Sequence, residues 1–236
     1  MYLLILAGGF GTRIRETIGG LPKILAPIYD TTFLKLQLDN WKRQGFKNFL
    51  FLLHHQSSLI ISSIKNYQNQ NFRDCKIEYI IENEPLDTGG AVINAVKKKN
   101  LEEFTLINAD TWIDNELIKV RNSSHNSIGV IERNNDERYG AILYDKRTGI
   151  IKSFVEKKSG KIGRSYINAG VFKFYGKIFK DYEIKKTSLE KEVIPKLVNK
   201  KLLKAVHLNT NFIDIGVPED YIKFIKFYKK RNYNGN

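Results

Sequence analysis

Short apolar stretches alternate with amphipathic ones through the first half of the chain. Residues 2–7 form an apolar run of strand length, and residues 32–45 place apolar side chains at helical spacing up to a glycine that suits a helix end. The alternation continues with predicted strands at 48–53, 76–81 and 104–108, and predicted helices at 57–67 and 89–99. Strands alternating with helices indicate parallel βαβ units, which place ligands at the carboxyl ends of the strands.

The second half of the chain has a different pattern of apolar and polar positions. Apolar runs joined by short polar connections predict strands at 127–132, 140–144, 150–156 and 166–174. Helices are expected at 188–199 and 218–229. No Pro- or Gly-rich linker, repeat or low-complexity tract interrupts the chain, so residues 1–236 are predicted to form a single domain with a mixed sheet.

Composition excludes several classes of protein. Hydrophobic residues make up 42% of the 236 residues, which is far from a disordered composition and allows a large core. Cys75 is the only cysteine, which excludes an intrachain disulfide and a multi-cysteine zinc site and fits a reducing cytoplasm. No apolar run approaches the roughly 18 residues needed to cross a bilayer, so we expect no membrane partner.

The net charge of +14 has two interpretations. It can attract nucleic acid, or it can reflect lysines spread over solvated faces. The basic runs at 97–99, 185–186 and 229–231 lack the interleaved aromatic side chains on which bases stack. We therefore expect a small anionic substrate and no nucleic-acid partner.

A glycine-rich loop follows the first predicted strand. Three glycines in four positions, 8–11, let backbone N–H groups approach an anion, and a helix starting after the loop would add its dipole. Ile14 replaces the third glycine of a dinucleotide-binding motif, and Arg13 replaces the second glycine of a phosphate-loop motif, so neither motif is present. Arg13 can hold phosphate oxygens bidentately and Lys23 supplies a mobile charge, whereas the alternative is a plain tight turn.

Two aspartates follow apolar strands that lie far apart in the sequence. Asp110 comes after the strand predicted at 104–108, and Asp214 precedes a glycine turn and a helix that begins with proline. Magnesium takes one or two protein carboxylates and completes its shell with water and substrate phosphates. Two aspartates on neighbouring strand ends would meet that need, although each alone is more often a turn or capping residue.

The segments LAGGFGTR (6–13) and PKILAPI (22–28) resemble the signature of the sugar-phosphate nucleotidyltransferases. Their short spacing is most similar to the D-glycero-α-D-manno-heptose 1-phosphate guanylyltransferase branch. The resemblance implies a three-layer, Rossmann-like α/β fold with a mixed, mostly parallel central sheet. It also implies nucleotidyl transfer from a nucleoside triphosphate, GTP in this branch, to a sugar 1-phosphate, with release of pyrophosphate. Ile24 departs from the proline usual in relatives.

The resemblance assigns roles to individual residues. Arg13 and Lys23 would be the catalytic residues that hold the triphosphate and stabilise the departing pyrophosphate. Asp110 and Asp214 match the metal-binding aspartates and would hold Mg²⁺, although Ala109 stands where relatives usually have glycine. The implied nucleotide-binding residues are Leu6, Ala7, Gly8, Gly9, Gly11, Thr12, Glu82, Asp87, Gly89 and Gly90.

The segment ENEPLDTGGA (82–91) resembles the one with which relatives recognise the nucleobase. Glu82 replaces a glutamine of thymidine-using relatives, and a carboxylate accepts from the adjacent N1–H and N2–H donors of guanine. An exposed acid at a strand end is the alternative. Gly89 and Gly90 would make room for a flat base or ribose. Asp87 replaces an expected glycine and either adds an acceptor or crowds the pocket, and the GGA ending also resembles uridine-using relatives.

On the sugar side, the resemblance assigns four further residues. Glu156 and Asn168 would hydrogen-bond sugar hydroxyls, Lys157 would bind the sugar phosphate, and Gly140 would let the ring approach the backbone. A uridylyl- or cytidylyltransferase acting on another phosphorylated acceptor stays an alternative. So does an inactive regulatory homologue, although the chain retains both predicted cations and both aspartates. The sequence leaves the exact sugar and a homo-oligomeric state open.

Overall fold

Nine strands form the central sheet in the described part of the chain, which comprises residues 1–134, 141–155 and 164–233. The strands are β1 Tyr2–Leu6, β4 Asn48–Leu53, β5 Lys76–Ile81, β6 Glu103–Asn108, β8 Ser127–Asn134, β9 Ala141–Tyr144, β10 Ile151–Val155, β11 Arg164–Tyr175 and β12 Lys204–His207. In this computed structural model the strand order is β10-β9-β11-β6-β1-β4-β5, and β8 joins β11 to β12.

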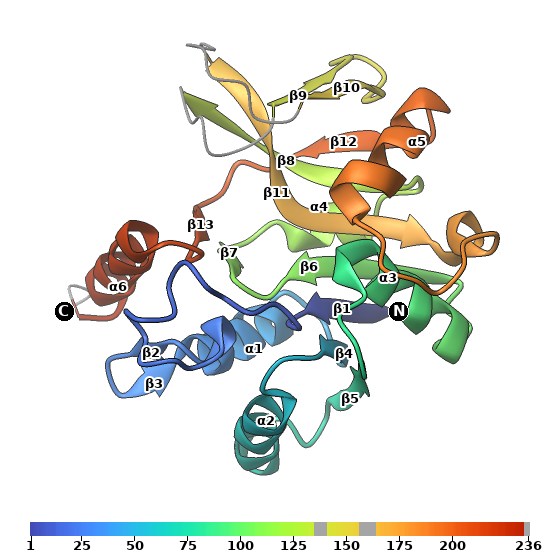
Figure 1. Cartoon of the computed structure of the whole chain (residues 1–236). Coiled ribbons are helices and arrows are strands. Elements are labelled where there is room, and N and C mark those ends of the chain that lie inside the picture. Colours follow the sequence, from blue (N-terminus) through green and yellow to red (C-terminus); the bar gives the residue numbers. More distant parts are fainter. Residues whose placement is uncertain (135–140, 156–163, 234–236) are drawn as a thin grey trace.

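Strand direction divides the sheet into two regions. The strands β6, β1, β4 and β5 run parallel, and Leu6 at the end of β1 pairs with Leu52 on one side and Asn108 on the other. Beyond β6, the strand β11 pairs antiparallel with β6, β8 and β9. Figure 1 shows this second region extending above the parallel strands. The predicted mixed sheet with parallel central strands is confirmed.

Helices cover both faces of the parallel strands, as predicted for a three-layer fold. The helices are α1 Phe33–Arg43, α2 Ser57–Asn71, α3 Asp87–Lys99, α4 Leu117–Arg121, α5 Ile194–Asn199 and α6 Pro218–Tyr233, with a π-helix at Leu189–Val193 and 3-10 helices at Lys23–Leu25 and Gly176–Phe179. Leu3 and Ile5 of β1 belong to the same cluster as the apolar side chains of α1. Leu4, which points to the other face, belongs to the cluster that includes α3.

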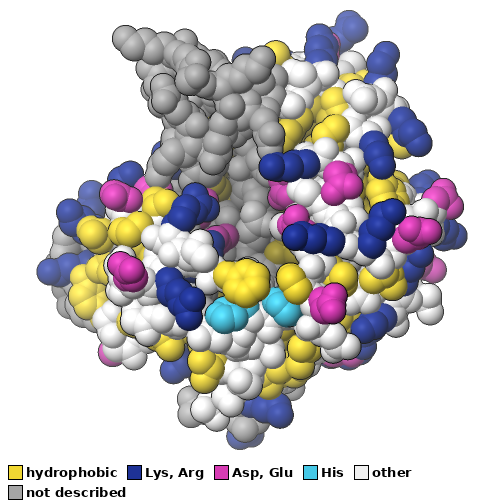
Figure 2. Space-filling view, viewed as in Figure 1, with side chains coloured by type: hydrophobic (Ala, Val, Ile, Leu, Met, Phe, Trp, Pro, Cys, Tyr) yellow, Lys and Arg dark blue, Asp and Glu magenta, His cyan; other side chains and the backbone are white. Residues whose placement is uncertain are grey.

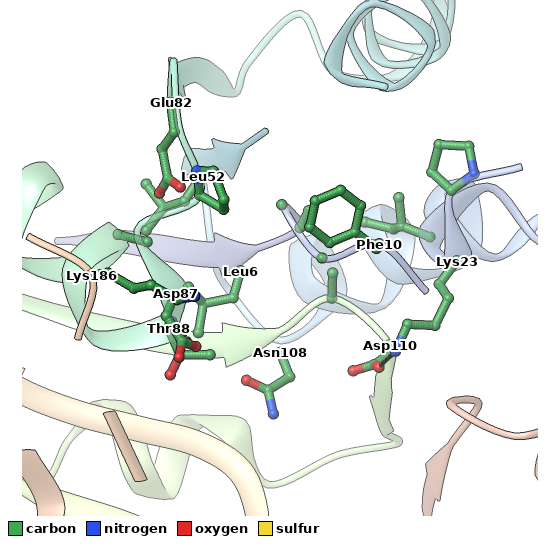
Figure 3. A pocket seen from close by; sticks show the side chains of 18 residues that line it. Leu6, Phe10, Lys23, Leu52, Glu82, Asp87, Thr88, Asn108, Asp110 and Lys186 are labelled. Carbon is green, nitrogen blue, oxygen red and sulfur yellow. Dashed lines mark hydrogen bonds and ion pairs between the residues drawn. The ribbon is translucent and has the colours of Figure 1, made fainter. Parts of the chain in front are cut away.

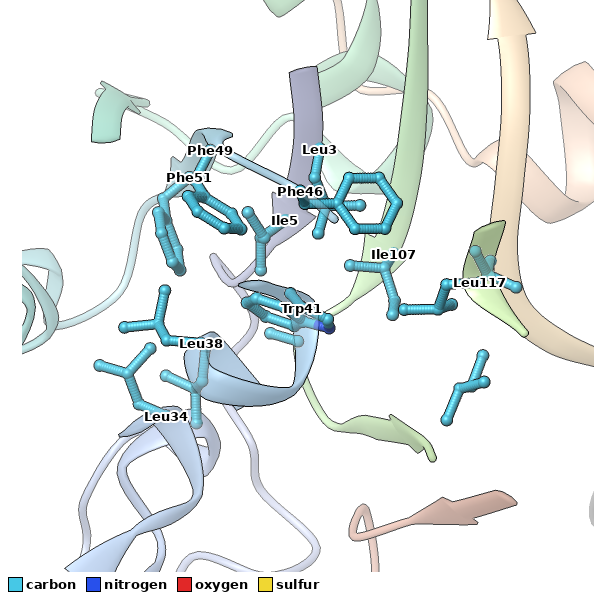
Figure 4. Close-up of a cluster of buried hydrophobic side chains, with 14 of the residues drawn as sticks. Leu3, Ile5, Leu34, Leu38, Trp41, Phe46, Phe49, Phe51, Ile107 and Leu117 are labelled. Atoms are coloured by element: carbon cyan, nitrogen blue, oxygen red, sulfur yellow. The ribbon is translucent and has the colours of Figure 1, made fainter. Parts of the chain in front are cut away.

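An aromatic cluster fixes α1 against the parallel strands (Figure 4). Trp41 is fully buried, and its ring centroid lies 6.3 Å from that of Phe49 and 6.5 Å from that of Phe51. Burying an apolar side chain of this size contributes about 1.5–3 kcal/mol. The cluster therefore anchors β1 and β4, whose carboxyl ends carry the glycine-rich loop and the start of the α2 connection.

The helix expected directly after the glycine-rich loop does not form, so that prediction is wrong. Residues 12–20 adopt consecutive turns, and the first regular element after them is the 3-10 helix Lys23–Leu25. Residues 12–20, which lie between glycines and Pro22, are too few to form a stable helix on their own. Ile14 and Ile18 fasten it by packing in a third buried cluster. No helix dipole therefore acts from this segment.

A two-stranded ribbon outside the central sheet carries Asp214. Strand β7, Thr111–Ile113, begins just after β6 and pairs antiparallel with β13, Phe212–Asp214, so that Asp214 faces Thr111. Asp214 therefore lies at the end of a strand that neighbours β7, next to Asp110, although this strand belongs to the ribbon and not to the central sheet. The buried side chains of Gln37 and Asn40 on α1 donate to the β7 carbonyls of Thr111 (2.7 Å) and Ile113 (2.8 Å), which holds the ribbon in place.

Two smaller elements and the surface complete the fold. A short hairpin joins β2, Pro27–Ile28, to β3, Thr31–Thr32, before α1 begins.

None of the described helices is both long and apolar enough to cross a bilayer. Figure 2 shows Lys and Arg side chains mixed with Asp and Glu on the face in view, without a single basic stripe. The absence of a nucleic-acid partner stays a prediction.

Candidate active site

The carboxyl ends of β1, β4 and β6 border a cavity of about 440 Å³. This volume falls within the range of small-ligand sites. The lining residues that the sequence predicts to bind nucleotide or metal are Leu6, Ala7, Gly8, Gly9, Lys23, Glu82, Asp87 and Asp110. The remaining lining residues are Phe10, Pro22, Ile24, Leu52, Pro85, Thr88, Ala91, Asn108, Ala109 and Lys186. The cavity therefore lies where a parallel sheet is expected to bind its ligand.

The two ends of the cavity carry different groups (Figure 3). Glu82 and Asp87 lie at one end, and Lys23 and Asp110 lie at the other, with Leu6 between them. Apolar side chains form much of the wall along this length. The cavity thus offers hydrogen-bond acceptors at one end and a cation beside a carboxylate at the other.

The glycine-rich loop packs closely against its neighbours. A Cβ at Gly8 would lie 3.2 Å from the backbone nitrogen of His54, and one at Gly11 would lie 3.0 Å from Cγ of Lys23. Gly11 also has a φ of +62°, a conformation that favours glycine. A Cβ at Gly9 would have no neighbour within 4 Å. The loop is therefore fixed to the end of β4, while the Lys23 side chain lies across it.

Charged side chains converge at the Lys23 end of the cavity. Lys23 forms an ion pair with Asp110. The backbone N–H of Ile215, next to Asp214, donates to the carbonyl oxygen of Asp110 at 3.0 Å, which brings the two aspartates together. A Cβ at Gly216 would lie 2.8 Å from Oδ1 of Asp214 and 3.6 Å from Nη2 of Arg13, so the guanidinium belongs to the same cluster.

The two aspartates repel each other in this arrangement. Burial and the neighbouring charge of Asp110 raise the pKa of Asp214 to about 6, even though Lys23, Arg13 and a hydrogen bond from the N–H of Gly216 act in the opposite direction. That hydrogen bond is 2.7 Å long. The carboxylate pair therefore carries negative charge that the protein's own cations only partly compensate.

Glu82 lines the opposite end of the cavity and is held by the turn that follows it. Its Oε2 accepts a hydrogen bond of 3.1 Å from the backbone N–H of Leu86, and its carbonyl oxygen lies 3.0 Å from Nδ1 of His54. Burial raises the pKa of the Glu82 carboxyl above its usual range. The side chain is therefore half-buried and faces the cavity, which is the orientation that base recognition requires.

Gly89 and Gly90 pack closely against a segment from the second half of the chain. Both backbone N–H groups donate to the carbonyl oxygen of Thr187, at 2.8 and 3.0 Å. A Cβ at Gly90 would lie 2.4 Å from the carbonyl oxygen of Lys185, and neither glycine lines the cavity. Their predicted role in making room for a base or ribose stays a prediction. They let the backbone of residues 185–189 pack on α3, and this contact brings Lys186 to the cavity.

The model of one protein family matches nearly the whole chain. Residues 2–231 match the family described as nucleotidyl transferase. The chain belongs to the nucleotidyl transferase family.

Two relatives of this nucleotidyltransferase resemble it along their full length. The D-glycero-alpha-D-manno-heptose 1-phosphate guanylyltransferase of Campylobacter jejuni is 35% identical over 95% of this chain and 99% of that protein. The crystal structure of HddC from Yersinia pseudotuberculosis superimposes with a TM-score of 0.83 at 35% identity, covering 97% of this chain and 99% of that one. A second HddC structure, complexed with GMP-PN, gives a TM-score of 0.81 at 34% identity. These comparisons confirm the predicted family and fold.

Several predicted residues of this nucleotidyltransferase do not line the cavity. Gly11, Thr12, Arg13 and Asp214 flank it at the Lys23 end instead. Asn168 lies in β11, where its Oδ1 accepts a hydrogen bond of 2.8 Å from the N–H of Gly170 at a break in the strand register. Gly140, Glu156 and Lys157 lie outside the described residues, so their predicted contacts with the sugar phosphate stay predictions.

Three polar residues of the lining are not among the predicted site residues: Asn108, Thr88 and Lys186. The position of Asn108 at the end of β6, two residues before Asp110, was a usable signal. Thr88 is held by the 185–189 segment, since the N–H of Leu189 donates to its Oγ1 at 2.9 Å. Lys186 gave no signal beyond its place in a basic run, because only tertiary packing brings it to the cavity.

The acidic cluster fits a magnesium ion that a substrate helps to bind. No group of three or more His, Cys, Asp or Glu side chains converges anywhere in the described residues. Two carboxylates alone leave most of an octahedral shell to water and phosphate oxygens, which is the usual arrangement for magnesium. The raised pKa of Asp214 also indicates a site that a cation would stabilise.

Proposed function

We propose that the protein transfers a guanylyl group from GTP to D-glycero-α-D-manno-heptose 1-phosphate, giving a nucleotide sugar and pyrophosphate. The observation that carries the proposal is the polarised cavity, with acceptors for a base at the Glu82 end and cations for phosphates at the Lys23 end. The full-length similarity to a heptose 1-phosphate guanylyltransferase supports the choice of substrates. We place the reaction in the cytoplasm, where the thiol of Cys75 stays reduced.

The chemistry is an in-line displacement at phosphorus. An oxygen of the sugar 1-phosphate attacks the α-phosphorus of GTP, the bond from that phosphorus to the bridging oxygen breaks, and pyrophosphate leaves with the electron pair. The attacking oxygen is already ionised at neutral pH, so no general base is needed. The protein must therefore bring two polyanions together and neutralise the charge that develops on the leaving group.

Arg13 and Lys23 supply that neutralising charge. The guanidinium of Arg13 binds phosphate oxygens in a fixed fork, whereas the flexible stem of Lys23 lets its ammonium exchange Asp110 for a phosphate oxygen. Lys186 is a second lysine in the cavity lining, and Figure 3 places it at the end of the cavity where Asp87 lies. These charges also raise the local concentration of anionic substrates.

Magnesium is the cofactor that we propose for this site. Asp110 and Asp214 would hold the ion together with phosphate oxygens of the substrate. When bound, it would supply positive charge to the reacting phosphates. The support is that these two carboxylates lie together, and that burial and the charge of Asp110 raise the pKa of Asp214.

A substrate panel tests the proposed function. Five nucleoside triphosphates (GTP, ATP, UTP, CTP and dTTP) are each combined with heptose, mannose and glucose 1-phosphates, and pyrophosphate release is followed with and without magnesium. We expect the highest kcat/KM for GTP with the heptose phosphate, and activity only with the metal. Preference for UTP or CTP would refute the guanylyl assignment, and no release with any pair would refute the enzyme assignment.

The Glu82 carboxylate provides a separate prediction about the base. Glu82→Gln replaces one acceptor with a donor, so the preference for GTP over UTP and dTTP should fall roughly ten- to a hundredfold, as expected for a lost hydrogen bond to a charged group. Glu84→Gln is the matched control, since Glu84 is exposed and does not line the cavity. An unchanged ranking of triphosphates in Glu82→Gln would show that Glu82 does not contact the base.

A further inference from the structure

Asp87 keeps a side chain at a position that favours glycine. Its φ is +61°, in the left-handed region, and it is the first residue of α3. A non-glycine residue is conformationally strained there, although Asp tolerates the region better than most residues. Glycine, which the sequence resemblance leads us to expect at this position, would avoid that strain. Asp87 therefore has a carboxylate side chain at a position where the backbone conformation favours glycine.

The Asp87 side chain lines the same end of the cavity as Glu82 (Figure 3). The two groups interact, because the charge of Asp87 adds to burial in raising the pKa of Glu82. Oδ1 of Asp87 accepts a hydrogen bond of 2.6 Å from the N–H of Thr88. Within the described residues, no hydrogen bond to its Oδ2 is seen. Asp87 thus presents an acceptor atom to the same end of the cavity that Glu82 lines.

Glu82 alone cannot satisfy every donor of guanine. Its Oε2 already accepts the N–H of Leu86. Guanine carries three hydrogens on its pairing edge, one on N1 and two on the 2-amino nitrogen, and a carboxylate binds two adjacent donors side by side. One hydrogen of the 2-amino group then has no partner on Glu82.

We propose that Asp87 is a specificity-determining residue that accepts a hydrogen bond from the 2-amino group of guanine. The proposal rests on the proposed guanylyltransferase function and extends it to a residue in which this chain departs from the family pattern. Uracil, thymine and cytosine offer fewer donors on this edge, and two carboxylates facing their acceptor oxygens would repel them. Asp87 and Glu82 together therefore select guanine more strongly than Glu82 does alone.

Inosine triphosphate provides the test, because hypoxanthine differs from guanine only in lacking the 2-amino group. The readout is the ratio of kcat/KM for GTP to kcat/KM for ITP, measured with the same sugar 1-phosphate. For the intact protein we expect a ratio of roughly ten or more. Asp87→Gly should lower this ratio about tenfold, and Asp87→Asn, which keeps a neutral acceptor, should lower it less.

A purely structural role for Asp87 would give a different result. If Asp87 acted only through the backbone of α3, Asp87→Gly would change GTP and ITP rates by the same factor and leave their ratio intact, which would overturn the proposal. Thermal unfolding should change little in Asp87→Gly, since the variant relieves the left-handed conformation but loses the hydrogen bond from the N–H of Thr88. A protein that prefers UTP over GTP would refute the proposed function itself, whereas an unchanged GTP/ITP ratio in a GTP-preferring protein refutes only this inference.

Discussion

The two ends of the parallel strands carry charged clusters that differ in how well the protein itself compensates their charge. At the amino end, the carboxylate of Glu78 is surrounded by Tyr2, Lys76 and Lys99. Hydrogen bonds from Lys99, Tyr2 and Lys76 lower the pKa of Glu78 to about 2. Every member of this cluster has a partner within the protein, so the cluster is electrostatically complete without a ligand.

At the carboxyl end, the negative charge is not fully compensated within the protein. Asp110 and Asp214 lie together, and the pKa of Asp214 is raised to about 6 by burial and by the Asp110 charge. Arg13 and Lys23 compensate this charge only in part. Groups whose ionisation is opposed by their surroundings concentrate at functional sites, because binding of a substrate or metal relieves the opposition. The cluster at the amino end therefore stabilises the fold, whereas the cluster at the carboxyl end is suited to bind a substrate or a metal.

Removing Lys23 should have the largest effect on activity. Lys23→Ala should lower kcat by about 10²–10³, or roughly 3–4 kcal/mol, as for other preorganised charges that stabilise a transition state. Steady-state pyrophosphate release measures the change. Lys99→Ala, at the amino end, is the matched control and should leave kcat within about twofold. A tenfold loss or less in Lys23→Ala would mean that another group stabilises the leaving pyrophosphate.

Removing one of the paired carboxylates should change the metal requirement. Asp110→Asn should raise the magnesium concentration for half-maximal velocity by at least about tenfold, because one charged ligand is lost. Circular dichroism should show an intact fold, since the substitution also removes the repulsion with Asp214. The same magnesium titration for the variant and the original protein would exclude Asp110 as a ligand.

Disrupting the amino-end cluster should affect stability and spare activity. Because the folded-state pKa of Glu78 is about 2, below its ordinary value of 4.5, its contribution is full above pH 4.5 and is lost as pH falls towards 2. Glu78→Gln should therefore cost about 1 kcal/mol at pH 7, after allowance for solvent screening, and less at pH 3. Urea unfolding at both pH values measures this difference. An equal loss at pH 7 and pH 3 would show that charge is not the cause.

The local sequence pattern predicts the parallel strands well because their signal is continuous. The predicted bounds of 48–53 and 76–81 coincide with β4 and β5, since β4 is an almost continuous apolar run and β5 is rich in isoleucine and tyrosine. Lys23 and Asp110 are also noticeable in the local sequence, because Lys23 belongs to the second N-terminal motif and Asp110 closely follows β6. Local order along the chain is sufficient for these features.

Features that depend on tertiary contact are not predictable in this way. The strand β13 is three residues long, and only its pairing with β7 shows that Asp214 reaches Asp110. Gly89 and Gly90 indicate a close approach but not its partner, which turns out to be the backbone of residues 185–189. Lys186 consequently escapes detection although it lines the cavity.

A crystal structure with a non-hydrolysable GTP analogue and Mg²⁺ tests the central claim most directly. The account predicts guanine between Glu82 and Asp87, the phosphates beside Arg13 and Lys23, and the ion on Asp110 and Asp214. An analogue bound in the reverse direction, or outside this cavity, would contradict it.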